Sequence, residues 1–109
     1  MRNGLYRTWF KGPFAQGSSA LILLNGQVIC SDPGHTYFGT FTDQGGVFVA
    51  DVRAKRHTNL ALPAAMADLD EFDIHCEGPS TRETALLTCT MPQAPGITVE
   101  IKMLWIGEI

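Results

Sequence analysis

The sequence predicts an all-β protein, a single up-and-down antiparallel barrel of about eight strands. Turn-forming residues interrupt the chain at roughly every eight to twelve positions, a spacing typical of all-β proteins. The runs between the turns are short and rich in β-branched and aromatic side chains. Apolar and polar residues alternate in several runs, so one face of the sheet is expected to be buried. Closing the sheet removes its exposed edges, and we therefore expect a barrel.

The runs between the turns define the predicted strands. They cover residues 5–10, 19–24, 27–31, 36–42, 47–56, 71–77, 83–91 and 98–106. Asn25-Gly26 is the strongest hairpin signal, because both central residues of a type I′ turn need a positive φ angle. Asp32-Pro33-Gly34 is a typical turn sequence between the third and fourth strands. Short turns of this kind join neighbouring strands that run antiparallel.

The predicted strand at 47–56 has the clearest alternation in the chain. Phe48, Ala50 and Val52 point to one side, whereas charged residues such as Asp51 point to the other. A strand with one buried and one solvated side favours antiparallel pairing. Its apolar side is therefore expected to face the interior of the barrel.

The alternation stops after this strand and resumes near residue 71. Residues 63–69 are expected to form one short helical turn between the fifth and sixth strands, since Pro63 suits the first position of a helix. Residues 1–109 show no linker and no repeat, so the chain is expected to be one domain. Closure of the barrel would place the first strand beside the last, and so bring Trp9 near Trp105.

Composition excludes several classes of protein. The chain is 45% hydrophobic and 17% charged, which is typical of a globular domain rather than a disordered one. Its net charge is −3 and no basic stripe is present, so direct nucleic-acid binding is not expected. The longest apolar run is too short to cross a membrane, and the first residues lack the apolar stretch of a signal peptide. We therefore expect a soluble, cytoplasmic protein.

The chain has three cysteines, Cys30, Cys76 and Cys89. An odd number argues against a secreted scaffold held by disulfides. Cys76 and Cys89 fall on neighbouring predicted strands, so their thiols would lie close together. We expect them to be free, buried and apolar in character, with a metal or redox role as the alternative. No Cys-x-x-Cys motif is present, and no pair of histidines has the spacing of metal ligands, so no metal and no cofactor are expected.

One segment holds the residue types of a nucleophilic site. Ser31 and Asp32 precede His35 by a few positions, but Pro33-Gly34 makes this segment a turn. Ser and Asp side chains in turns usually bond to their own backbone. No base with an orienting partner stands beside a nucleophile elsewhere in the sequence. We therefore expect a binding protein and not an enzyme.

Four short motifs occur in order in the first half of the chain. They are Gly4-Leu5-Tyr6, Asn25-Gly26, Ser31-Asp32-Pro33-Gly34 and Tyr37-Phe38-Gly39-Thr40. Together they resemble the GrlR-type negative regulators of type III secretion. This resemblance implies a lipocalin-like, calycin-like β-barrel that forms homodimers. It also implies a bacterial regulator that binds and restrains a transcriptional activator of the helix-turn-helix class.

The hairpin after the fourth predicted strand departs from the family. The characterised member has an exposed Glu-Asp-Glu-Asp run there, which is implicated in regulation. The matching positions in this chain read Asp43-Gln44-Gly45-Gly46, and only Asp43 is charged. A nearly neutral loop should attract a basic activator only weakly, because charge complementarity steers such encounters. The fold can therefore carry over while the partner does not.

Two functions follow as hypotheses. The first is a cytoplasmic homodimeric regulator that sequesters a protein partner through exposed hairpin and strand residues, with a transcriptional regulator as one candidate for that partner. Its partner-binding residues are expected to be Thr42, Asp43, Gln44, Gly45, Arg53 and Lys55. The second is a carrier that holds a small apolar ligand inside the barrel. Its cavity wall is expected to include Phe48, Ala50, Val52, Phe72, Ile74 and Trp105.

Overall fold

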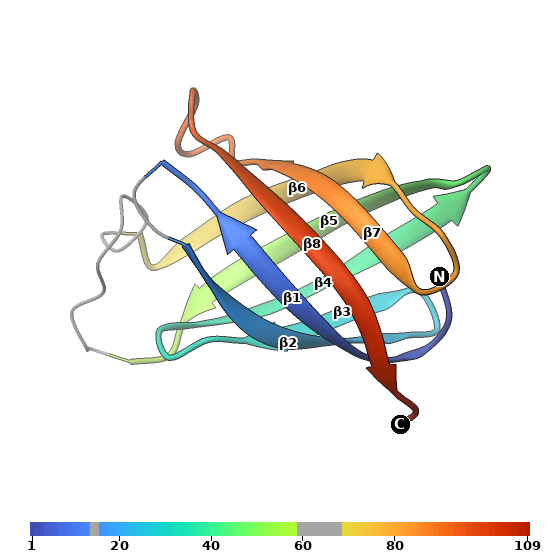
Figure 1. Cartoon of the computed structure of the whole chain (residues 1–109). Coiled ribbons are helices and arrows are strands. Elements are labelled where there is room, and N and C mark those ends of the chain that lie inside the picture. The colour runs from blue at the N-terminus through green and yellow to red at the C-terminus, as the bar shows by residue number, and fades with distance from the viewer. Residues whose placement is uncertain (14–15, 59–68) are drawn as a thin grey trace.

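Eight antiparallel strands close into a barrel in which every strand pairs with its neighbours in sequence and β1 pairs with β8 (Figure 1). The computed structural model describes residues 1–13, 16–58 and 69–109. The strands are β1 (Gly4–Lys11), β2 (Gln16–Leu24), β3 (Gln27–Ser31), β4 (His35–Gln44), β5 (Val47–Arg56), β6 (Glu71–Pro79), β7 (Thr84–Thr90) and β8 (Thr98–Gly107). The predicted up-and-down barrel is therefore confirmed. The predicted helical turn falls on a segment that lies, apart from its last residue, outside the described residues.

Two tight hairpins follow from residues that accept a positive φ angle. Asn25 and Gly26 have φ angles of 50° and 81°, as the predicted turn between β2 and β3 requires. Gly45 and Gly46 have φ angles of 60° and 77° and join β4 to β5 in the same way. The alternation of each strand then sets which residues face inward. Phe48, for example, is 2% exposed.

The seam between β1 and β8 closes the barrel, but it does not bring the two tryptophans together. Tyr6 pairs with Trp105, whereas Trp9 pairs with Lys102. Trp9 lies on the outer face of β1 and is 37% exposed. Trp105 packs with the core on the inner face of β8. The prediction that Trp9 lies near Trp105 was therefore wrong, because strand pairing fixes the neighbours while alternation separates the faces.

The barrel has two distinct ends. Both chain termini lie toward one of them, which we call the N-terminal end (Figure 1). Residues before β1 cover this end: the Tyr6 hydroxyl donates to the Arg2 carbonyl oxygen at 2.6 Å, and the Trp105 indole donates to the Asn3 carbonyl oxygen at 3.2 Å. The Arg2 guanidinium lies 3.8 Å from the centre of the Trp105 ring system. We call the opposite end, which carries the β1–β2, β3–β4 and β7–β8 connections, the far end.

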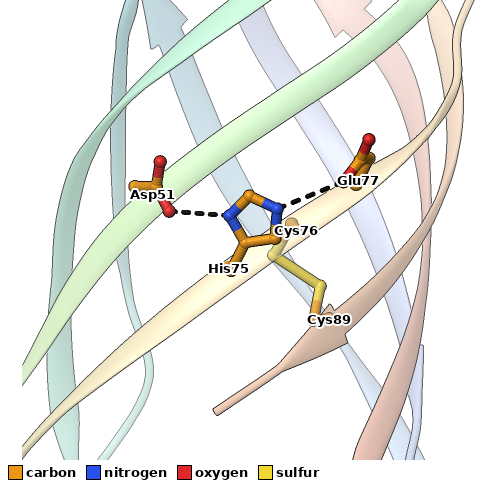
Figure 2. Close-up of a disulfide and its surroundings, with 5 residues drawn as sticks. All are labelled: Asp51, His75, Cys76, Glu77 and Cys89. Carbon is orange, nitrogen blue, oxygen red and sulfur yellow. Dashed lines mark hydrogen bonds and ion pairs between the residues drawn. A yellow bond between two sulfur atoms is a disulfide. The ribbon is translucent and has the colours of Figure 1, made fainter. Parts of the chain in front are cut away.

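A disulfide joins Cys76 to Cys89 across the β6–β7 seam (Figure 2). The two residues pair directly, with Cα atoms 4.1 Å apart. The expectation that both cysteines carry free thiols was therefore wrong. The sequence pattern placed them on neighbouring strands, but only the register shows that they stand opposite each other. Cys30 is the one free cysteine.

Candidate functional site

The barrel contains a cavity of about 760 Å³ that is partly open to solvent. Leu23 and Phe48 line its deep part, and Gly12, Pro13 and Pro33 line it at the far end. The cavity therefore runs from the middle of the barrel to the far end. Small side chains contribute to this space: Ala50 is 3% exposed and faces inward between larger neighbours on β4 and β6.

The half of the wall that β5 to β8 supply is wholly apolar within the described part of the chain. Its side chains end in carbon or sulfur and offer no hydrogen bond to a ligand except the weak acceptor capacity of sulfur. The lining residues from this half are Phe48, Ala50, Val52, Phe72, Ile74, Cys76, Leu87, Cys89, Met91, Ile97, Val99, Ile101 and Met103. Five of the six residues predicted for the cavity wall are among them.

Trp105, the sixth predicted wall residue, lies elsewhere. It sits at the N-terminal end, where Arg2 stacks on its ring and its indole nitrogen donates to Asn3. A Cβ atom added at Gly4 would come within 2.9 Å of the indole Cδ1, so the ring fills the space beside that glycine. Trp105 thus helps to cover the end of the barrel and does not line the cavity.

Among the described residues, the polar side chains of the wall lie in the other half, on β1 to β4 and their connections. The Thr8 and Ser19 hydroxyls face each other on paired strands, with their oxygens 2.8 Å apart. The Tyr37 hydroxyl donates to Asp32 Oδ2 at 2.5 Å. Burial, followed by this bond to Asp32, raises the pKa of Tyr37. The phenol therefore stays protonated and keeps its donor on the carboxylate.

Asp32 holds the β3–β4 connection in shape. Its Oδ1 atom accepts the backbone N–H groups of Gly34 and His35, each at 2.7 Å. This is the bonding of an Asx turn, which the sequence predicted for the segment. The carboxylate is thus held at the far end of the cavity by backbone donors on one oxygen and by Tyr37 on the other.

His35 is buried in the wall of the cavity and is 3% exposed. Its Nε2 atom lies 3.0 Å from the Leu69 carbonyl oxygen. A carbonyl oxygen only accepts, so Nε2 carries the hydrogen of this bond. The edge of the ring packs against Phe72, with the ring centres 5.2 Å apart.

Sequence reasoning did not assign the polar wall residues to the cavity. Thr8 carried a usable signal, because it alternates with Tyr6 and Phe10 on the inner face of β1. Asp32, His35 and Tyr37 carried none, since the chain alone did not show that their turn lies at the open space inside the barrel. The sequence indicates only a turn around Asp32 and His35.

The residues predicted to bind a protein partner do not form one patch. Thr42, Gln44 and Gly45 are exposed in the β4–β5 hairpin at the N-terminal end. Arg53 and Lys55 lie further along β5, toward the far end, opposite Phe38 and Thr36. The alternation of β4 also separates Asp43 from its neighbours in the hairpin, because it points inward.

Two of these predicted residues already have partners within the chain. The Asp43 carboxylate pairs with the Met1 amino group and accepts the Ser80 hydroxyl at 2.6 Å. These bonds outweigh its burial and lower the pKa of Asp43. Arg53 pairs with Glu71 at 2.7 Å and with Asp73 at 2.9 Å. Neither charge is therefore free to attract a partner without giving up an existing contact.

A second charged cluster lies on the outer face, beside the disulfide (Figure 2). His75 Nδ1 is 2.7 Å from Asp51 Oδ1, and His75 Nε2 is 3.2 Å from Glu77 Oε2. The bond to Asp51, and then the bond to Glu77, raises the pKa of His75. Both ring nitrogens are therefore occupied as donors, which leaves no lone pair for a metal ion.

No protein-family model matches the chain, and no curated protein is similar enough to count as a match. The described residues contain no group of three or more His, Cys, Asp or Glu side chains placed to hold a metal ion. Within the same residues, no helix is long and apolar enough to cross a membrane. The features of the described residues that bear on function are therefore the cavity and the outer surface of the barrel.

Proposed function

We propose that the protein binds a small, largely apolar molecule inside the barrel. The observation that carries this proposal is the cavity of about 760 Å³ with one wholly apolar half. Its volume is within the range of about 300–1,000 Å³ that is typical of sites for small molecules. Barrels of about eight strands are also of the right diameter to hold one such ligand.

The energetics favour an apolar occupant over water. Core side chains normally pack to the density of organic crystals, so a space of this size leaves its lining without many of its dispersion contacts. Water is a poor substitute beside β5 to β8, because that half of the wall offers it few partners. An apolar ligand would restore the contacts and remove its own surface from water, a gain of about 25 cal/mol for each Å² buried.

The test measures ligand binding before and after a larger side chain is placed in the wall of the cavity. N-phenylnaphthylamine, a neutral dye that fluoresces in apolar surroundings, would be titrated into the protein. We expect saturable binding by the native chain and its loss in Ala50→Phe, because the new ring would occupy the cavity. Val49→Phe is the matched control, since it adds a comparable ring on the outer face of the same strand. Circular dichroism would verify that both variants keep the barrel, and equal dye binding by Ala50→Phe would contradict the proposal.

A second candidate is the regulator that sequesters a protein partner. Phe38 supports it: this aromatic ring is 55% exposed on the outer face and stands opposite Arg53, with Lys55 nearby on β5. Aromatic side chains and arginine are enriched at protein interfaces. The homodimer and the cytoplasmic location stay predictions. The Cys76–Cys89 disulfide is a bond more typical of oxidising compartments than of the cytoplasm.

Native mass spectrometry of the gently purified protein separates the two candidates. A monomer that carries additional small-molecule mass would support the carrier. An empty dimer would support the regulator and direct the search to a protein partner. Phe38→Ser would then be expected to weaken the partner complex without loss of dye binding.

A further inference from the structure

We propose that the cavity selects ligands whose head group donates hydrogen bonds and is not anionic, an apolar alcohol or amine in preference to a carboxylate. This inference rests on the proposed function, since it names the chemistry of the ligand that the same cavity takes. Two features of the wall support this inference. The first is the sign of the charges that line the cavity, and the second is the set of hydrogen-bonding groups that have no partner within the protein.

The charge in the wall is negative. Asp32 is the only Asp or Glu among the lining residues of the described chain, and no Lys or Arg is among them. The segments 14–15 and 59–68 contain no lysine and no arginine in their sequence, so they bring no fixed positive charge. A ligand carboxylate inside the barrel would therefore lose its hydration without gaining a cation. It would also lie in the same low-dielectric space as Asp32 and be repelled.

His57 Nε2 lies 2.9 Å from the Asp32 carbonyl oxygen, but His57 is not among the residues that line the cavity. Arg56 also lies beside this arrangement. Arg56 is the last residue of β5, in phase with the inward-facing residues of that strand, and it pairs with His35 at the far end. Its guanidinium is bonded to Asp70, however, with Nε 3.0 Å from Oδ1, and it does not line the cavity. A ligand carboxylate inside the cavity would therefore not contact this cation. The arrangement therefore gives an anion no ready partner.

The free hydrogen-bonding groups of the wall are mostly acceptors. Tyr37 has its hydrogen on Asp32 and keeps only lone pairs. His35 has its Nε2 hydrogen on the Leu69 carbonyl oxygen, so this nitrogen offers a ligand no donor. Asp32 Oδ2 retains room for a second donor beside Tyr37, since a carboxylate oxygen has two lone pairs. A hydroxyl or ammonium group can donate to these atoms, whereas a carboxylate cannot.

The Thr8–Ser19 pair gives the wall of β1 and β2 a hydrogen to donate. One hydroxyl of the pair donates to the other, and when Ser19 is the donor the hydrogen of Thr8 is left for a ligand. A hydroxyl head group can accept this hydrogen and donate its own to an acceptor on the wall. Because all these groups lie on β1 to β4, the ligand's apolar body is expected to lie against β5 to β8.

The test compares head groups on one apolar chain. Dodecanol, dodecylamine and dodecanoate would compete with bound N-phenylnaphthylamine. We expect the alcohol and the amine to displace the dye at concentrations at least about tenfold lower than the carboxylate, the effect of about 1.4 kcal/mol of discrimination. The tails are equal in length, so a difference between these ligands reports on the head group.

Asp32→Asn tests the cause of the discrimination. It removes the charge while an amide oxygen can still accept the two backbone N–H groups, so we expect the preference for amine over carboxylate to shrink by about tenfold. Asp51→Asn removes the same charge from the outer face and should leave the preference unchanged. Tyr37→Phe is an independent variant: it frees Oδ2 of its donor and should strengthen amine binding.

The outcomes separate the two proposals. If dodecanoate displaces the dye best, the inference about the head group is overturned while ligand binding in the barrel stands. Equal displacement by all three ligands, unchanged in Asp32→Asn, would likewise overturn it. If neither the dye nor any of the three ligands binds, the proposed function itself fails.

Discussion

Cys76 and Cys89 stand directly opposite each other, and their disulfide crosses the middle of the shortest strand pairing in the barrel. β6 and β7 are paired at only three positions, whereas β4 and β5 are paired at ten. The bond therefore reinforces the seam that backbone hydrogen bonds hold least. Both cysteines also line the cavity, so the same bond fixes a part of the wall that a ligand would contact.

Removing this disulfide should destabilise the barrel. The cysteines are 13 positions apart, and closing a loop of that size is expected to contribute about 3 kcal/mol. We expect the variant Cys76→Ala with Cys89→Ala to unfold in urea with that loss of free energy. Reducing the native protein should give a similar loss. Cys30→Ala is the control, since Cys30 forms no disulfide, and an equal loss in that variant would contradict the assignment.

The architecture was predictable because alternation and turn residues mark each strand, and because strands that are consecutive in sequence are also neighbours in this barrel. Alternation located all eight strands, and Asn25-Gly26 marked a hairpin that has the required positive φ angles. An up-and-down barrel pairs strands that are consecutive in sequence, so strand order alone gives every pairing except closure. Closure then follows from the cost of leaving two sheet edges exposed.

Register and cavity content were not predictable in the same way. The disulfide depends on Cys76 and Cys89 being opposite each other, and the turn between their strands does not fix that alignment. Trp9 and Trp105 show the same limit, because they lie on paired strands but at different levels and on opposite faces. Whether inward side chains fill a barrel or leave a space depends on how they pack together. A single small residue such as Ala50 is compatible both with a filled barrel and with one that contains a cavity.

Cys30 should report on occupancy of the cavity. Its thiol lines the cavity and donates to the Ala20 carbonyl oxygen at 3.3 Å. Burial, with a smaller effect from Asp32, raises the pKa of Cys30, so little reactive thiolate is present near neutral pH. We expect slow alkylation by iodoacetamide in the native protein, still slower alkylation with N-phenylnaphthylamine bound, and fast alkylation in urea. Mass spectrometry measures the rates.

Ala50→Phe is the control for this experiment. Ala50→Phe should weaken dye binding, so the dye should no longer slow alkylation of Cys30 in that variant. If the dye binds the native protein and leaves the alkylation rate unchanged, then it binds outside the cavity and the proposed site is wrong.

His75 should make a small, pH-dependent contribution to stability. Its folded-state pKa is raised above the ordinary value of 6.5 by Asp51 and then by Glu77. A group with a raised pKa stabilises the fold when it is protonated. The contribution is therefore complete below pH 6.5 and is lost as the pH rises through the folded-state pKa. Because the cluster is exposed to solvent, salt should reduce this contribution.

NMR titration of the imidazole ring measures this effect directly. We expect Asp51→Asn to lower the pKa of His75 more than Glu77→Gln does, since the bond to Asp51 is the larger cause. His75→Gln should remove the corresponding pH dependence of the urea midpoint. If the two carboxylate variants leave the pKa of His75 unchanged, the triplet is not formed in solution.

Gly39 should tolerate no side chain. It pairs with Val52 across β4 and β5, and an added Cβ atom would lie 2.7 Å from the Val52 Cα atom and within 2.9 Å of the Asp51 carbonyl carbon. These are backbone atoms, which cannot rotate away as the end of a long side chain can. We expect Gly39→Ala to lower the free energy of unfolding by roughly 1–3 kcal/mol, as overpacking does. Gly107→Ala is the control, because an added Cβ there meets nothing within 4 Å. Equal urea midpoints for the two variants would mean that β4 and β5 lie further apart at this position than the structure places them.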